Sequence, residues 1–147
     1  MADPKRKLAA IVFTDIEGFT ELSASNEPAA LELLNTQRDT LKPIVEKHGG
    51  EWLKEIGDGL LLCFNTSLEA VKCSIDIQKA AKRIKNLDLR IGIHQGEVVI
   101  QEDDVVGDDV NITSRIESFS AVGGIAVSQK INASLQRNPE YKTTYIG

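Results

Sequence analysis

The chain has 147 residues, which is enough for one domain of ordinary size, and its 41% hydrophobic and 27% charged residues are typical of a globular protein. A net charge of −5, with one short basic cluster at residues 5–7, argues against a nucleic-acid binder. No apolar run is long enough for a membrane span or a secretory signal. Two cysteines are too few for a disulfide framework or a metal set, so we expect a cytoplasmic protein without membrane insertion.

Hydrophobic patterning predicts a β-α-β-β-α-β order of elements. Short apolar runs rich in strand formers alternate with segments whose apolar residues recur at helical spacing. The predicted strands are 8–13, 51–56, 60–64 and 89–94, and the predicted helices are 26–47 and 67–84. This order is that of a ferredoxin-like α+β fold with a mainly antiparallel sheet. We expect residues 97–101 to pair back on strand 89–94 as a hairpin.

A C-terminal extension of helix, strand, helix and strand is expected after this core. An acidic loop at 101–106 leads into it. Its predicted elements are a helix at 108–119, a strand at 124–127, a helix at 128–135 and an alternating edge strand at 141–146. We therefore expect residues 1–7 to be an N-terminal tail and residues 8–147 to form one domain.

Two aspartates are expected to meet at one edge of the sheet. Asp15 follows the first predicted strand, and Asp58 lies in the turn that ends the second. Because a helix crosses over between these strands, we expect them to be parallel neighbours. Two carboxylates there would form an oxygen-ligand site suited to Mg²⁺ or Mn²⁺. Each aspartate taken alone is also explained by an ordinary turn.

Two further patterns indicate contacts with a ligand. Residues 16–20 lead into a helix start, where backbone N–H groups are a natural seat for phosphate, so we expect Gly18, Phe19 and Thr20 to contact substrate. Asn111 and Arg115 stand four residues apart on a predicted helix, so they share a face and can address one ligand. An ordinary surface polar pair is the alternative explanation of that spacing.

Three other polar residues have plain structural explanations. Lys54 alternates with Trp52 and Ile56 and is expected to share their strand face, where it could be an ordinary surface lysine. Asp104 could belong to the tip of a solvated acidic loop. His94, in an alternating strand with no acidic or cysteine partner nearby, is expected to be structural.

Four short motifs follow one another between about Leu8 and Ile146. They read FTDIEGFT at 13–20, KEIGDG at 54–59, RIGIHQGE at 90–97 and GDDVNITSR at 107–115. Together they resemble the catalytic domain of class III nucleotidyl cyclases, the adenylyl and guanylyl cyclase family. The resemblance implies the class III cyclase fold and a head-to-tail homodimer with shared active sites. The family's final hairpin, whose lysine grips the β- and γ-phosphates, would have no counterpart before Gly147.

The resemblance also implies a metal site. Asp15 and Asp58 match the family's two metal-binding aspartates, and the Ile16 carbonyl matches a further ligand. These groups would hold two Mg²⁺ or Mn²⁺ ions per active site.

Substrate contacts follow from the same resemblance. Lys54 and Asp104 match the pair that reads the purine, and Asn111 and Arg115 match the pair that stabilises the transition state on substrate held mainly by the partner subunit. Adenine presents an amino donor where guanine presents an acceptor, so Asp104 suits the adenine amino group and Lys54 suits the adjacent ring nitrogen. Guanine-specific members of the family typically carry glutamate and cysteine at these two positions.

The expected function is that of an adenylyl cyclase, which converts ATP to cyclic AMP and pyrophosphate by two-metal-ion catalysis at a homodimer interface. The alternative is a truncated, weakly active or inactive cyclase-homology domain that binds nucleotide or dimerises. Family members often carry a sensor domain, so one is expected in the full-length parent. A ferredoxin-like RNA-binding domain is disfavoured by the acidic charge and by the 5% content of aromatic residues.

Overall fold

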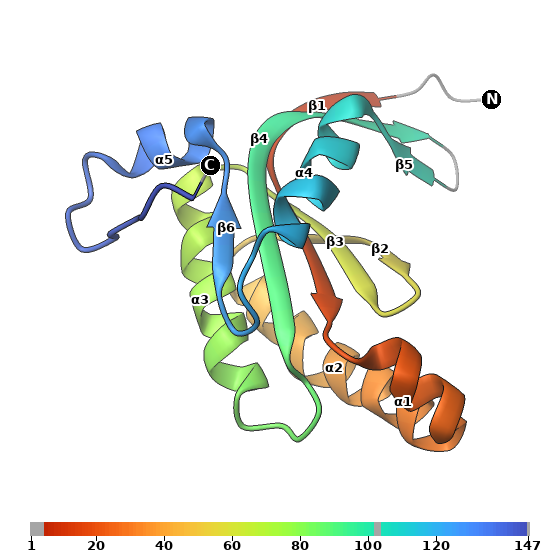
Figure 1. Cartoon of the computed structure of the whole chain (residues 1–147). Helices are drawn as coiled ribbons and strands as arrows, with labels where there is room; N and C mark the ends of the chain where they lie inside the picture. Colours follow the sequence, from red (N-terminus) through yellow and green to blue (C-terminus); the bar gives the residue numbers. More distant parts are fainter. Residues whose placement is uncertain (1–4, 102–103, 147) are drawn as a thin grey trace.

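Figure 1 shows the computed structural model of the chain, which describes residues 5–101 and 104–146. Within these residues the strands are β1 (Lys5–Ile16), β2 (Glu51–Ile56), β3 (Gly59–Phe64), β4 (Leu89–Gln101), β5 (Asp104–Val106) and β6 (Ile125–Val127). The helices are α1 (Phe19–Ser25), α2 (Glu27–Lys47), α3 (Ser67–Ala81), α4 (Asp108–Ser118) and α5 (Gln129–Leu135). The strands form one sheet in the order β2-β3-β1-β4-β5, and β6 pairs with β4. All strand pairs are antiparallel except β4 with β6.

The predicted β-α-β-β-α-β order is confirmed: α2 is the helix expected at 26–47, and α1 is an additional short helix before it. The expectation that the first two strands are neighbours is wrong, because β3 lies between β1 and β2. Both strands are antiparallel to β3, so they do run in the same direction. β2 and β3 form a hairpin, and β3 pairs with β1 as far as Thr14↔Leu60. The β2–β3 turn therefore lies beside the end of β1.

β4 is one strand of 13 residues, and the predicted hairpin within residues 89–101 is wrong. The strand pairs with β1 from Lys5↔Ile100 to Ile16↔Leu89. Gly96 does not reverse the chain, because it lies within the continuous strand and pairs with Ala9 of β1. A Cβ at this position would come within 2.2 Å of the Asp109 carboxyl carbon. The glycine instead allows a close approach of α4 to the strand. The segment that does pair back on the end of β4 is β5.

Both ends of the described chain differ from the prediction. β1 begins at Lys5, so residues 5–7 belong to the sheet and not to a tail. Residues 141–146 form no strand, so the predicted final edge strand is wrong. The alternation there does not reflect a buried face, since Tyr145 and Ile146 are 91% and 69% exposed and only Tyr141 packs against the core. An alternating pattern makes a strand only where a neighbouring strand accepts its hydrogen bonds.

Two hydrophobic clusters cover the two faces of the sheet. The larger one packs α2, α3 and α5 against one face, and the smaller one packs Val110 of α4 against Ile11 and Leu61 on the other. Figure 1 shows α4 on the opposite side of the sheet from α2 and α3. Asp15 alternates in phase with Ile11, so it lies on the face that α4 covers. None of the helices within the described residues is long and apolar enough to cross a membrane.

Candidate functional site

The end of β1 and the β2–β3 turn bring Asp15 and Asp58 to one corner of the molecule. Asp58 Oδ2 accepts a hydrogen bond from the Ile16 backbone N–H at 2.8 Å, so the turn carboxylate is held directly against the strand end. Gly57 has a φ of 59°, a left-handed conformation that glycine adopts without strain. The expected convergence of the two aspartates is therefore observed, although it is reached through the hairpin and not through neighbouring strands.

A third carboxyl group, that of Glu117 in α4, lies within hydrogen-bonding reach of Asp15. Its residue is 3% exposed, and this burial, followed by the hydrogen bond and charge of Asp15, raises the pKa of Glu117 to about 8. The nearby cation is Arg90, whose Nη1 pairs with Glu17 and lies 3.8 Å from Asp15 Oδ1. Asp15 Oδ1 is a buried atom with no hydrogen-bond partner among the described residues. The corner, completed by Asp58, thus concentrates negative charge.

Glu117 is expected to make the metal-free protein less stable as the pH rises from about 5 to about 8. In this range the folded state keeps a proton that the unfolded state, with the ordinary pKa of 4.5, has released. The free energy of unfolding should therefore fall by up to about 1.4 kcal/mol per pH unit. Glu117→Gln should remove this contribution to the pH dependence of the free energy of unfolding. Urea unfolding in EDTA at several pH values measures that dependence.

The matched control for this prediction is Glu32→Gln, which changes an exposed carboxyl of α2. That variant should keep the wild-type slope, and Glu117→Gln should be more stable than the wild type at a pH of about 8. A Glu117→Gln curve parallel to that of the wild type would contradict a buried carboxyl that stays protonated in the folded state.

The predicted phosphate seat lies directly after this corner. α1 begins at Phe19 with Gly18 as its N-cap residue, and no side chain of the described residues caps the helix. Its first backbone N–H groups therefore have no partner within the helix. Gly18 and Thr20 are exposed, whereas the Phe19 side chain packs partly against the larger hydrophobic cluster. A phosphate seat at this position would therefore consist of backbone donors, and the Phe19 ring contributes packing.

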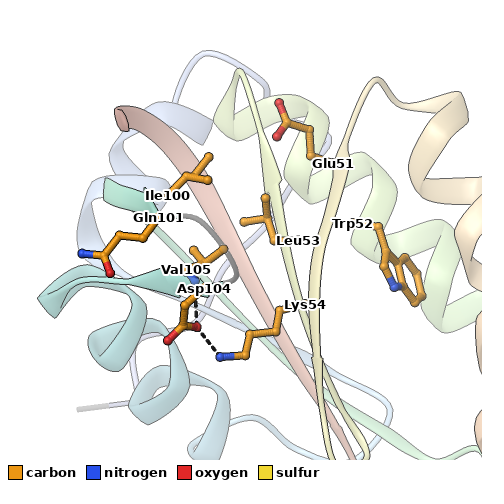
Figure 2. A pocket seen from close by; sticks show the side chains of 8 residues that line it. All are labelled: Glu51, Trp52, Leu53, Lys54, Ile100, Gln101, Asp104 and Val105. Atoms are coloured by element: carbon orange, nitrogen blue, oxygen red, sulfur yellow. Dashed lines mark hydrogen bonds and ion pairs between the residues drawn. The ribbon is translucent and has the colours of Figure 1, made fainter. Parts of the chain in front are cut away.

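Lys54 and Asp104 meet between β2 and β5, which stand at opposite ends of the strand order (Figure 2). Lys54 Nζ donates a hydrogen bond to Asp104 Oδ1, which also accepts one from the Val105 backbone N–H at 2.8 Å. These two bonds, the Lys54 bond first, hold the pKa of Asp104 below its ordinary value. Both side chains line a groove of about 390 Å³ together with Leu53 and Ile100. The structure thus brings the predicted pair together at an accessible groove.

A β-bulge in β2 sets the direction of Lys54. The register passes from Trp52↔Leu62 to Lys54↔Leu61, so Leu53 is the extra residue. Trp52 and Lys54 oppose successive residues of β3 and therefore lie on opposite faces, so the expectation that they share a face is wrong. Figure 2 shows the two side chains pointing apart, with Lys54 directed at β5. A regular strand would have put Lys54 on the face that α2 and α3 cover.

α4 is anchored on β4 at both of its ends. At the first turn, Asp109 accepts hydrogen bonds from the Glu97 backbone N–H at 2.8 Å and from His94 Nε2 at 3.1 Å. The Glu97 bond, and after it His94, hold the pKa of Asp109 below its ordinary value. At the last turn, Gly92 allows a close approach, because a Cβ there would lie 2.4 Å from the Glu117 nitrogen. The expectation that His94 has no acidic partner is wrong, since it takes part in this anchor.

Asn111 and Arg115 are presented to solvent by this anchored helix. The buried residues of α4 are Val110, Thr113 and Glu117. Asn111 and Arg115 lie one turn apart on the other side and are exposed, and within the described residues neither side chain makes a hydrogen bond or an ion pair. The structure therefore does not bring them into contact with Asp15 and Asp58 of the same chain, whereas Glu117 from the same helix does reach that corner.

Three side chains near the corner were not predicted from the sequence: Glu117, Arg90 and Gln37. Two of them, Gln37 and Glu117, could have been recognised in the sequence, because each is a polar residue in the buried stripe of a helix. Gln37 lies between Leu33 and Leu41 in α2, and Glu117 continues the stripe of α4. A buried glutamate or glutamine in such a stripe is uncommon unless it has a specific partner. The contact of Arg90 depends on the β1–β4 register, which no local pattern contains.

The corner fits a divalent cation that is bound together with substrate. Over residues 5–101 and 104–146, no group of three or more His, Cys, Asp or Glu side chains is arranged to hold a metal ion. One or two carboxylates are what Mg²⁺ commonly takes from a protein when water and substrate phosphates complete its shell. The buried Asp15 Oδ1, which has no hydrogen-bond partner among the described residues, is an oxygen that a cation could bind. The pKa of Glu117 is raised first by burial and then by Asp15, so the charge of Asp15 is felt by its neighbour.

Comparison with known proteins gives one family over the whole chain. The family described as "Adenylate and Guanylate cyclase catalytic domain" matches residues 2–147. A curated relative from Rhizobium meliloti (strain 1021), named "Putative adenylate cyclase 3", is 32% identical over 136 residues, which cover 87% of this chain and 23% of that protein. This chain spans 16% to 34% of the length of the first curated relatives it matches.

Solved structures are similar over almost the same extent. The "Adenylate/Guanylate Cyclase/Hydrolase" from Silicibacter pomeroyi has a TM-score of 0.87 at 31% identity, covering 99% of this chain and 89% of that chain. The catalytic core of a rhodopsin-guanylyl cyclase with converted specificity, in complex with ATPαS, has a TM-score of 0.83 at 27% identity, covering 92% of this chain and 84% of that chain.

Proposed function

Because this chain belongs to the family of adenylate and guanylate cyclase catalytic domains, we propose that it is an adenylyl cyclase domain that converts ATP to cyclic AMP and pyrophosphate. The observation that carries the proposal is the Lys54–Asp104 pair, a donor and an acceptor side by side at an accessible groove. The corner formed by Asp15 and Asp58 supports the same reaction, since a triphosphate needs cations to offset its charge.

The purine-reading pair favours adenine over guanine. Asp104 is a hydrogen-bond acceptor, and its lowered pKa keeps it in that form, which suits the amino group of adenine. Lys54 is a donor and suits the adjacent ring nitrogen. Guanine would place its carbonyl oxygen where the adenine amino group lies, opposite the Asp104 carboxylate. The name of the Rhizobium meliloti relative, "Putative adenylate cyclase 3", supports the same assignment. The similar rhodopsin-guanylyl cyclase core with converted specificity is solved with ATPαS, so we base the choice of purine on the Lys54–Asp104 pair and not on the fold.

Asp15 and Asp58 would hold the divalent cations, Mg²⁺ or Mn²⁺, with the Ile16 carbonyl as a further oxygen ligand. When bound, such cations lower the pKa of the ribose 3′-hydroxyl and neutralise the leaving pyrophosphate. The Ile16 N–H fixes the Asp58 carboxylate for this role. The backbone N–H groups at residues 18–20 would bind phosphate oxygens at the start of α1.

Asn111 and Arg115 are the residues we propose for the chemical step. The ribose 3′-hydroxyl gives up its proton to water, its oxygen attacks the α-phosphorus, and the bond from that phosphorus to the leaving pyrophosphate oxygen breaks. Arg115 offsets the negative charge that grows on the α-phosphoryl oxygens, and Asn111 orients the ribose. The anchor at Asp109 and His94 holds α4 in place, so both side chains project from a fixed support.

A second copy of the chain would complete the site. Asn111 and Arg115 do not contact the aspartates of their own chain, and large apolar side chains next to the site elements are exposed. These are Ile56 in β2, Val106 in β5 and Phe119 at the end of α4. A head-to-tail homodimer would cover such side chains and place Asn111 and Arg115 of one subunit at the Asp15–Asp58 corner of the other.

We place this reaction in the cytoplasm. Cys63 and Cys73 are free and buried, which fits a reducing compartment. Burial raises the pKa of Cys63 to about 11 and that of Cys73 to about 12, so both remain unreactive thiols at neutral pH.

The direct test supplies purified protein with ATP or GTP and with Mg²⁺ or Mn²⁺, and measures cyclic nucleotide at several protein concentrations. We expect cyclic AMP to exceed cyclic GMP and the rate to rise faster than linearly with protein concentration, as a shared dimer site requires. Cyclic GMP as the main product would overturn the adenylyl assignment. If nucleotide raises the melting temperature but no cyclic product forms, the domain would be a nucleotide-binding module and not an active cyclase.

Exchanging the purine-reading pair should move the preference from ATP toward GTP. In Lys54→Glu with Asp104→Cys, the glutamate can accept from the guanine ring N–H and the cysteine no longer repels the guanine oxygen. Each well-placed base contact is worth about 1–3 kcal/mol, so the ratio of kcat/KM for ATP to that for GTP should fall by about 10–100-fold. Lys42→Glu with Asp39→Cys, the same exchange at exposed positions of α2, should leave the ratio unchanged. An unchanged ratio in the folded pair variant would remove Lys54 and Asp104 from purine recognition.

A further inference from the structure

The β2–β3 turn is tied to α2 by a buried amide. Gln37 is 2% exposed, and its Nε2 donates a hydrogen bond to the Asp58 carbonyl oxygen at 3.3 Å. Its neighbours in the buried stripe of α2 are apolar: Ala30, Leu33, Leu41 and Val45. The one polar residue of this stripe therefore reaches the residue that carries the turn carboxylate.

Stability alone does not account for a glutamine at this position. Gln37 Oε1 is buried and has no hydrogen-bond partner among the described residues, and Thr14 Oγ1, on the same face of the sheet, is in the same condition. A leucine or methionine would continue the apolar stripe and would leave no unpaired amide oxygen in the interior, which is unfavourable. What the glutamine supplies, and an apolar residue cannot, is the N–H donor to Asp58.

Asp58 is consequently held at both its backbone and its side chain. The Gln37 amide binds its carbonyl oxygen from α2, and the Ile16 N–H binds its carboxylate from β1. The residue before it, Gly57, has a left-handed φ, which glycine adopts without strain, and the turn is closed by the pair Ile56↔Gly59. Without the bond from α2, the hairpin pairing and the β1 contact would be left to fix the direction of the carboxylate.

We propose that Gln37 is a positioning residue that holds the Asp58 carboxylate in the orientation needed to bind a divalent cation. This inference rests on the proposed function, in which Asp58 is a metal ligand. Removing an outer partner of a metal ligand typically lowers metal affinity or activity by about 10–100-fold. The effect of losing the Gln37 amide should therefore appear in the metal requirement and not in the stability of the fold.

The test compares Gln37→Met with Gln78→Met. Gln78 is also buried, and its Nε2 donates to the Leu89 and Gly124 carbonyl oxygens at 2.9 Å and 2.8 Å and not to the Asp58 turn. We expect Gln37→Met to raise by about 10-fold the Mn²⁺ concentration needed for half-maximal activity and for half of the Mn²⁺-induced rise in melting temperature. Its melting temperature without metal should equal or exceed that of the wild type. Gln78→Met should lower the melting temperature and keep the wild-type Mn²⁺ requirement.

An unchanged Mn²⁺ requirement in Gln37→Met, or an equal increase in both variants, would overturn the positioning role. Amide hydrogen exchange in the metal-free protein separates this inference from the cyclase proposal. The Ile16 N–H bonds to Asp58 Oδ2, so in Gln37→Met its exchange should become faster while the other amides of β1 keep the wild-type rate. Faster exchange at Ile16, with no cyclase activity even in the wild type, would refute the proposed function and support the positioning of Asp58. Unchanged exchange at Ile16 would refute the positioning itself.

Discussion

The Asp15→Asn variant is expected to lose more than about 100-fold in cyclase turnover and to become more stable in the absence of metal. Losing an outer partner of a metal ligand already costs about 10–100-fold, and Asp15 is proposed to bind the cation directly. For the metal-free fold the change is favourable. It removes one negative charge beside Glu117, and it supplies amide N–H groups that can donate to the Glu117 carboxyl. Gains in stability at the expense of activity are common where a site gathers like charges.

Both properties can be measured on one preparation of Asp15→Asn, as the melting temperature in EDTA and as cyclic AMP formation with Mn²⁺. Asp39→Asn makes the same change at an exposed position of α2 and should leave both values at the wild-type level. Wild-type turnover in Asp15→Asn would end the metal assignment. A loss of turnover together with a lower melting temperature would instead contradict the account of like charges crowded at this corner.

Arg115→Ala is expected to lower kcat by about 10²–10³, the typical effect of removing one preorganised donor to transition-state charge. The stability of the protein should hardly change, because the Arg115 side chain is exposed and makes no hydrogen bond or ion pair within the described residues. Steady-state kinetics and thermal melting of the same sample measure the two effects. Arg83→Ala, also exposed, is the control, and a wild-type kcat in Arg115→Ala would exclude this arginine from the chemical step.

Mixing inactive variants tests whether the site is shared between subunits. Arg115→Ala and Asp58→Ala should each have at most about 1% of the wild-type activity alone, but a heterodimer of the two has one site with every proposed residue intact. With equal amounts and random exchange of subunits, activity should recover to about a quarter of the wild-type value. The absence of any recovery, when the heterodimer is detected by size and mass, would contradict a site built from two chains.

Much of the fold could be predicted because its elements are strongly patterned. The β-α-β-β-α-β order follows from apolar runs and helical spacing, and the family match over residues 2–147 confirms the predicted family. The convergence of Asp15 and Asp58 follows from the direction of the chain, even though β3 separates the strands that bring them there. The common face of Asn111 and Arg115 follows from the helical repeat. The chemical roles of these residues stay predictions that the variants above test.

The errors came from features that depend on neighbouring elements. Gly96 lies within β4 because α4 packs over it, and local sequence cannot distinguish that glycine from one in a turn. The bulge at Leu53 turns Lys54 to the face of Asp104, although the unbroken alternation predicted the opposite face. Residues 141–146 alternate like a strand but have no strand to pair with among the described residues. The periodicity of a segment shows which of its side chains could be buried. The register of a strand and the strand it pairs with depend on the neighbouring elements that pack against it.

The sequence by itself determined the order of the elements, through hydrophobic patterning, and the family and the candidate residues, through the four motifs. Only the tertiary structure decided how those residues are held and charged. Gln37 contacts Asp58, which is 21 residues away along the chain, and Lys54 contacts Asp104, which is 50 residues away. Glu117 of α4 likewise lies beside Asp15 of β1. The pKa of a carboxyl depends on its burial and on the charges that surround it, and both are set when distant segments pack together. A net charge of −5 is a property of the sequence, but the gathering of Asp15, Asp58 and Glu117 at one corner is a property of the fold.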